Sequence, residues 1–282
     1  MRPAIIAFFN DLFGVELFQW LVPTPAVLYL LAALAILVVY DRRARRAGLE
    51  SFHVLGAAIW GGVGGLLGAR LGYLLLRADQ VVASPAILLD PAGTTISWGA
   101  YAGGVLGFIL YLGRHHEPVG RYADVAGSTL GLGPAIGRLA CFLNGDDYGA
   151  VTSVPWGVSY PEGSFALAEH AARGLVSAHA TESLTVHPVQ LYLAANGLLL
   201  FLGFTWLLRR GGLRPGSLFL LYWVAYGVTR FGLEYFREPY GRITVAGFPD
   251  GQLLALVTGL AAAAAAAALH NRRARLALVG GG

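Results

Sequence analysis

Three arginines lie inside apolar stretches of the sequence. Arg70, Arg138 and Arg230 are each surrounded by hydrophobic and small residues. An arginine at the centre of a membrane helix costs about 2.5–3.5 kcal/mol, so it persists only where something compensates its charge. Because the planar guanidinium donates paired hydrogen bonds to phosphate, these positions indicate a site for an anionic group.

The three arginines are expected at similar depths. With a rise of about 1.5 Å per residue, Arg138 and Arg230 lie roughly 9 Å from one membrane surface, and Arg70 lies nearer to it. Glu234 is the clearest carboxylate at that depth, so cations outnumber anions. A phospholipid phosphate is the anion naturally present there. For Arg138, an alternative is that its side chain extends to the membrane surface.

Glu234 follows Arg230 by four residues, and Arg237 follows by seven. On a helix these three side chains share one face. They can form a ladder of ion pairs that is complete in itself, or they can contribute to an anion site. The sequence leaves both interpretations open.

Other polar residues near the ends of apolar stretches are candidates for positioning a substrate. The segment HPVQLY, residues 187–192, supplies His187, Gln190 and Tyr192. Pro188 suits the first turn of a helix, so His187 can be either a helix-entry residue or a site residue. Tyr29 and Tyr73 can be site residues or ordinary interfacial aromatics.

The composition is that of a membrane protein. Of 282 residues, 56% are hydrophobic and only 13% are charged, whereas soluble domains carry nearer 25% charged residues. The single cysteine, Cys141, excludes an internal disulfide and a CxxC motif. The histidines show no metal-ligand spacing, so we expect no metal, no cofactor and no nucleic-acid partner. The net charge of +4 comes from arginine without lysine.

Seven apolar stretches predict an all-α polytopic membrane protein with seven transmembrane helices. They lie at 23–40, 52–76, 94–113, 124–144, 188–208, 216–235 and 251–270. Twelve of the twenty arginines fall in the segments that follow the first, third, fifth and seventh stretches. The positive-inside rule therefore predicts an N-terminus outside and a cytoplasmic C-terminus.

The same pattern predicts the domain organisation. We expect an interfacial segment at 1–22, transmembrane helices 1–4 at 23–144, an extracytoplasmic head at 145–187, helices 5–7 at 188–270 and a cytoplasmic tail at 271–282. Glycines at four-residue spacing in the second stretch predict close helix packing.

Several blocks resemble one family, in that family's order. They are GARLGYLL at 68–75, GGVLG at 103–107, GRLACFLNGDDYG at 137–149, PWGVSYP at 155–161, HPVQLYL at 187–193 and RFGLEYFREP at 230–239. The chain thus resembles the bacterial prolipoprotein diacylglyceryl transferases, enzymes of the bacterial cytoplasmic membrane. The resemblance implies transfer of the diacylglyceryl group of phosphatidylglycerol to the cysteine thiol of prolipoprotein signal peptides, with release of glycerol phosphate.

The resemblance also implies roles for particular residues. It assigns phosphate contact to Arg138 and Arg230, and it matches Asn144 to the signature's second asparagine. Lipid-binding positions that also match the family are Tyr29, Arg70, Glu234 and Arg237.

Three positions depart from the family pattern. Cys141 replaces the signature's first asparagine, Asp146 replaces the usual glutamate, and Ala102 stands where many members have histidine. Candidates for a general base are then Asp146, Tyr101 and His187, in that order. The departures leave open a paralogue with another acceptor. A lipid or anion transporter and an inactive lipid-binding scaffold are alternatives from other classes.

Overall fold

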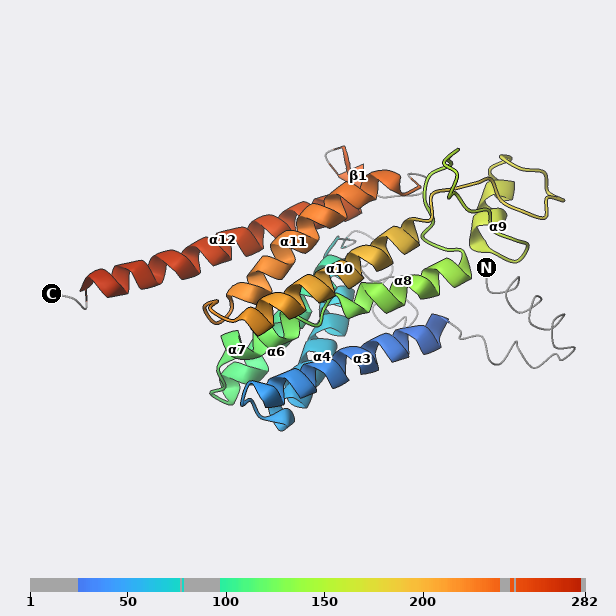
Figure 1. The fold of residues 1–282 in the computed structure, drawn as a ribbon. Helices are drawn as coiled ribbons and strands as arrows, with labels where there is room; N and C mark the ends of the chain where they lie inside the picture. The colour runs from blue at the N-terminus through green and yellow to red at the C-terminus, as the bar shows by residue number, and fades with distance from the viewer. Residues whose placement is uncertain (1–24, 77, 79–96, 239–243, 246, 280–282) are drawn as a thin grey trace, which may run out of the picture. The chain divides into compact units, whose positions relative to one another are not determined.

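The computed structural model describes residues 25–76, 78, 97–238, 244–245 and 247–279. The expected interfacial segment at 1–22 and the first residues of two expected spans lie outside this part. Within it the chain is mostly helical (Figure 1). The helices are α3 (Pro25–Arg46), α4 (Ser51–Leu76), α6 (Ser97–Arg114), α7 (Val119–Gly127), α8 (Leu132–Asn144), α9 (Phe165–Ala172), α10 (Val189–Arg210), α11 (Ser217–Leu233), the 3-10 helix η2 (Glu234–Phe236) and α12 (Asp250–Val279); strands β1 (Thr244–Val245) and β2 (Phe248–Pro249) pair antiparallel.

Among the residues that the structure describes, four helices are long and apolar enough to cross a membrane: α3, α4, α10 and, over Gly251–Asn271, α12. A fifth is added if α7 and α8 form one broken span. Of the other expected spans, α11 has only 17 residues, and α6 has 18 with many glycines. The helical membrane class is therefore confirmed, while the count of seven and the orientation stay predictions.

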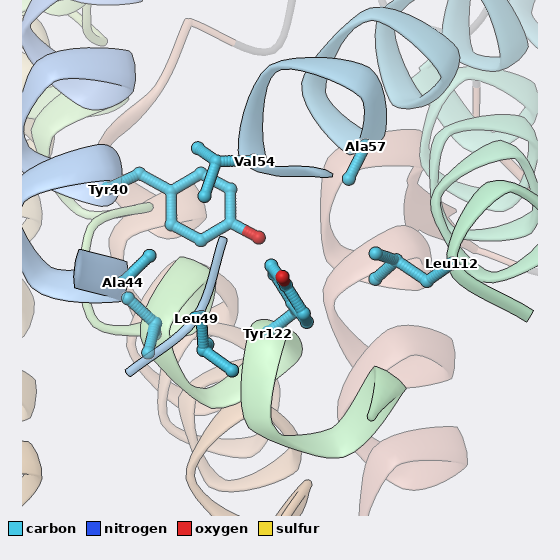
Figure 2. Close-up of a cluster of buried hydrophobic side chains, with 8 residues drawn as sticks. Tyr40, Ala44, Leu49, Val54, Ala57, Leu112 and Tyr122 are labelled. Carbon is cyan, nitrogen blue, oxygen red and sulfur yellow. The ribbon is translucent and has the colours of Figure 1, made fainter. Parts of the chain in front are cut away.

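Two compact units make up the chain, residues 37–126 and residues 1–36 with 127–282. In the first, a buried cluster joins the end of α3 to α4, α6 and α7 (Figure 2). Its largest fully buried members include Tyr122 and Leu112. The Tyr122 hydroxyl accepts a hydrogen bond from the Glu50 backbone N–H at 3.1 Å, which fixes the start of α4.

Helices α4 and α6 touch through their backbones. A Cβ built on Gly103 would lie 2.1 Å from the Gly64 carbonyl oxygen, and one on Gly68 would lie 2.1 Å from that of Gly99. Lipid tails are as apolar as leucine, so helices in a membrane gain little by burying hydrophobic surface against one another. Small residues instead allow close van der Waals contact, as the glycine spacing predicted.

In the second unit α11 packs along α12 and α10 packs along α8 (Figure 1). Glycines again permit the approach. A Cβ on Gly227 of α11 would lie 2.6 Å from the Ala255 carbonyl oxygen, and one on Gly131 would lie 2.4 Å from that of Gly197. These contacts bring the ends of α8, α10 and α11 together with the segment that follows α8.

Residues 145–187 form a small polar-rich structure around buried Tyr148, Tyr160, Ala166 and Val186. Ser164 caps the start of helix α9, because its hydroxyl accepts a hydrogen bond from the Leu167 N–H at 3.3 Å. We call residues 145–187 the head, and its assignment as a separate domain stays a prediction.

His170 lies inside the head with no exposed surface. Its Nδ1 accepts a hydrogen bond from the Leu184 N–H at 3.2 Å, so the ring is neutral when this bond is made. Burial lowers the pKa of His170 and Arg173 lowers it further, against the opposing effect of Glu238 and Glu169.

A first prediction concerns the glycine contact. Gly103→Ala should lower the free energy of unfolding by about 1–3 kcal/mol, because its methyl group would overlap a backbone oxygen that cannot move alone. Gly62→Ala is the matched control, since nothing lies within 4 Å of its Cβ position. There alanine should be neutral or stabilising. Thermal unfolding in detergent micelles measures both, and equal midpoints would contradict the packing.

A second prediction concerns pH. In the unfolded chain His170 binds a proton near the usual pKa of about 6.5. In the folded head it binds this proton only at a lower pH. The stability of the head is therefore full above pH 6.5 and falls as the pH drops below it. His170→Asn keeps an acceptor for the Leu184 amide and should reduce this loss between pH 7.5 and 5.5. Hydrogen exchange of the head amides measures it. Exposed His179→Asn should change nothing, and an unaltered pH dependence in His170→Asn would refute the assignment.

Candidate functional site

The turn after α8 separates two neighbouring carboxylates. Gly145 ends the helix in the left-handed conformation, with φ 73°, and its N–H donates to the Cys141 carbonyl. Asp147 is also left-handed, with φ 52°, which is uncommon for a residue other than glycine and is tolerated best by Asn and Asp. Asp146 and Asp147 consequently contact different partners.

Asp147 takes part in a chain of five alternating charges, which we call the ladder. Arg138 Nη1 lies 2.5 Å from Asp147 Oδ2, and Arg237 contacts Asp147 Oδ1. Arg237 Nη1 also lies 3.3 Å from Glu234 Oε1, and Glu234 Oε2 lies 2.7 Å from Arg230 Nη1. The ladder thus connects α8, the following turn, the end of α11 and η2.

Exposure differs between the side chains of the ladder and is highest at Asp147. The Glu234 side chain is completely buried and that of Arg230 is 10% exposed, whereas the Asp147 side chain is 40% exposed. Burial alone would raise the pKa of Asp147, but Arg237 and Arg138 outweigh it and hold this pKa below its usual range. The ladder joins three guanidiniums to two carboxylates.

These contacts revise the expectations for the arginines. Arg138 pairs with Asp147, a residue that was not among the predicted site residues. Arg230 and Arg237 both pair with Glu234, as the ladder interpretation expected, although α11 ends at Leu233 and Glu234 begins a 3-10 turn.

Asp146 lies in a second polar cluster with two residues of the expected site. The Asn144 amide donates to Asp146 Oδ2 at 2.7 Å, and Gln190 Nε2 donates to the Asp146 backbone carbonyl at 2.7 Å. Asp146 Oδ1, Gln190 Oε1 and the Tyr160 hydroxyl are buried without a hydrogen-bond partner among the described residues. This cluster therefore has unused acceptors beside the Tyr160 hydroxyl, whose pKa is raised by burial against the opposing effect of the Gln190 side chain.

His187 and Tyr192 contact each other. The Tyr192 hydroxyl lies 3.3 Å from His187 Nδ1 and accepts a hydrogen bond from Trp156 Nε1 at 2.7 Å. Phe236 packs against both rings. Trp156 and Tyr160, both within PWGVSYP, were missed as partners of the site, although their block was noticed.

Tyr29 lies beside α8. Its hydroxyl is 3.2 Å from the Cys141 sulfur, and its ring is the nearest neighbour of Gly137. Cys141 is buried. Arg70 and Tyr101 belong to the other compact unit, so their part in the site stays a prediction; the Arg70 guanidinium lies 5.9 Å from the centroid of the Tyr73 ring. Within the described residues, no three His, Cys, Asp or Glu side chains form a group that could hold a metal ion.

Fold and site together define a helical membrane protein with paired arginines at its helix ends. The family described as prolipoprotein diacylglyceryl transferase matches residues 15–268, and the chain belongs to this family. Relatives named phosphatidylglycerol–prolipoprotein diacylglyceryl transferase include those of Clostridium tetani, 27% identical over 92% of this chain and 94% of its own, and Vibrio vulnificus, 32% identical over 83% of each. The Rhodospirillum rubrum relative of the same name is 31% identical over 77% of this chain and 75% of its own.

A third prediction tests the buried half of the ladder. Glu234→Gln removes the counter-charge of Arg230 in a buried position and should lower the free energy of unfolding by about 3–5 kcal/mol. Glu162→Gln, at an exposed carboxylate of the head outside the ladder, makes the same change of charge and should leave it unaltered. Thermal unfolding of the two purified variants gives the comparison. Equal midpoints would show that Arg230 does not depend on Glu234.

Proposed function

We propose that this chain transfers the diacylglyceryl group of phosphatidylglycerol to the cysteine thiol of prolipoprotein signal peptides. The main support is that a chain of this family holds Arg138, Arg230 and Arg237 together in one set of ion pairs. The three guanidiniums of the ladder suit a lipid phosphate, because guanidiniums bind phosphate oxygens in pairs. Asn144, Glu234 and Tyr29 would complete the lipid site.

The reaction replaces a carbon–oxygen bond by a carbon–sulfur bond. The thiolate attacks the glyceryl carbon that carries the phosphate, the carbon–oxygen bond breaks, and glycerol phosphate leaves with the electron pair. Arg138 and Arg230 would stabilise the charge on the leaving phosphate, which is effective where water is excluded. The thioether forms without a cofactor.

The thiol, with a usual pKa of about 8.5, must first lose its proton. Asp146 remains our first choice for the base, because Oδ1 has no donor among the described residues while Asn144 and Gln190 hold the rest of the residue. His187 is the next choice in this unit, with Tyr192 and Gln190 positioning the peptide. Tyr101 stays a candidate from the other unit.

We further propose the seven-span topology in the bacterial cytoplasmic membrane, with the head outside and the C-terminus in the cytoplasm. The basic residues at the ends of two helices support it. Helix α3 ends with Arg43, Arg45 and Arg46, and α10 ends with Arg209 and Arg210, as expected of cytoplasmic helix ends. The head would then meet the signal peptide on the side where the lipoprotein emerges.

The fourth prediction is an in vitro transfer assay. Purified protein, phosphatidylglycerol vesicles and a peptide with a lipobox cysteine should give the diacylglyceryl adduct by mass spectrometry. Arg138→Ala should reduce its rate by about a hundredfold or more, the loss typical of removing one donor to a developing anion. Arg209→Ala, an exposed arginine at the other end of α10, is the control and should retain the activity.

Two outcomes would count against this function. If the wild-type protein gives no adduct but binds phosphatidylglycerol in a way that needs Arg138, the acceptor is another molecule. If Arg138→Ala and Arg209→Ala behave alike, the ladder is not the phosphate site.

A further inference from the structure

We propose that Asp147 is an internal substitute for the lipid phosphate. Its carboxylate holds Arg138 and Arg237 before the lipid arrives, and the phosphodiester of the donor lipid displaces it on binding. This rests on the proposed function for the identity of the ligand. It adds a residue that sets the affinity of the site.

The geometry of the carboxylate resembles that of the group it would be exchanged for. Asp147 presents one oxygen to Arg138 and the other to Arg237. A phosphodiester also presents two charged oxygens from one centre, and arginine binds both kinds of anion with the same pair of donors. The two guanidiniums are therefore already spaced around a single two-oxygen anion.

Of the two carboxylates in the ladder, only Asp147 is accessible. Its side chain is 40% exposed, whereas Glu234 has no exposed side-chain surface. A buried charge that loses its partner is strongly destabilised, so Glu234 is held with Arg230. A part-exposed carboxylate regains water when it leaves its arginines, and its exchange is correspondingly easier.

Displacement requires movement of the side chain rather than of the backbone. On one side of Asp147, the Asp146 carbonyl accepts from Gln190 at 2.7 Å. On the other, the Tyr148 carbonyl accepts from the Glu238 N–H at 3.3 Å, and the Gly149 N–H donates to the His187 carbonyl at 3.1 Å. With the backbone fixed on both sides, rotation about the Cα–Cβ bond moves the carboxylate away and leaves Arg138 and Arg237 in place.

An internal anion lowers the apparent affinity for an external one, because the fraction of sites open to the ligand is reduced. Removing the charge of Asp147 should therefore tighten lipid binding. The opposite is expected if Asp147 serves only to brace Arg138, since the brace would then be lost.

The fifth prediction compares Asp147→Asn with Glu162→Gln, which changes the charge of the head equally but outside the ladder. Binding of phosphatidylglycerol to each protein is titrated in phosphatidylcholine nanodiscs without a peptide acceptor, so no turnover occurs. Asp147→Asn should bind on the order of fivefold more tightly, the size expected for losing part-exposed ion pairs. Asparagine tolerates the left-handed backbone at this position, so the turn is retained. Asp147→Ser should change affinity in the same direction.

Two further titrations test where the gain in lipid affinity arises. In an Arg138→Ala background, Asp147→Asn should improve binding less, because one of the released guanidiniums is missing. A titration with soluble glycerol phosphate separates a free phosphate from the lipid, and a gain for the soluble compound alone would overturn the assignment to the lipid.

Unchanged or weaker binding of phosphatidylglycerol by both Asp147 variants would overturn the inference, even where the wild-type protein catalyses transfer and the proposed function stands. Tighter binding in a protein that gives no adduct would retain the role of Asp147 and overturn only the proposed reaction.

Discussion

The pairing of guanidiniums with carboxylates in a place poor in water is the constraint on which this structure depends. A buried charge without a partner costs several kcal/mol, and Glu234 stands 2.7 Å from Arg230, whose side chain is 10% exposed. Glu234 in turn contacts Arg237, which contacts Asp147, which contacts Arg138. Each charged side chain pairs with a neighbour of opposite charge. One continuous set of ion pairs therefore holds the end of α8 and the end of α11 together.

The two compact units solve the packing problem of a membrane protein in different ways. In residues 37–126, α4 and α6 approach until glycine backbones touch, and the contact needs no polar group. In the other unit, glycine contacts between α8 and α10 are supplemented by side-chain hydrogen bonds at the helix ends, such as that from Gln190 to the Asp146 carbonyl. Close packing supplies rigidity, and the polar contacts fix the direction of the side chains that a phosphate would meet.

Sequence periodicity and charge were sufficient for the features that depend on local chemistry. The apolar runs predicted α3, α4, α10 and α12, but arginine-rich segments extend two of these helices beyond the predicted ends, α3 by six residues to Arg46 and α12 by nine to Val279. The cost of burial singled out Arg138 and Arg230, and the four-residue spacing placed Glu234 on the same helix face as Arg230, which made their pairing one of two open interpretations. Asp147 was missed as a partner because its direction is set by left-handed residues at 145 and 147, which the dipeptide itself does not specify. Trp156 and Tyr160 were missed for a related reason, since they reach Tyr192 and the Gln190 cluster only through the folding of the head.

The departures from the family signature are consistent with the contacts around them. Asp146, where the family usually has glutamate, takes its hydrogen bond from Asn144 only two residues earlier, and a short side chain suits so local a contact. Cys141, where the family usually has asparagine, meets the Tyr29 hydroxyl at 3.2 Å inside the unit. A thiol is a weak hydrogen-bonding group and an amide is a strong one. Cysteine at this position therefore needs fewer hydrogen-bond partners than asparagine would. Polar recognition at the end of α8 is accordingly concentrated in Arg138, Asn144 and the two aspartates, all within two turns of Asn144, where the helix ends.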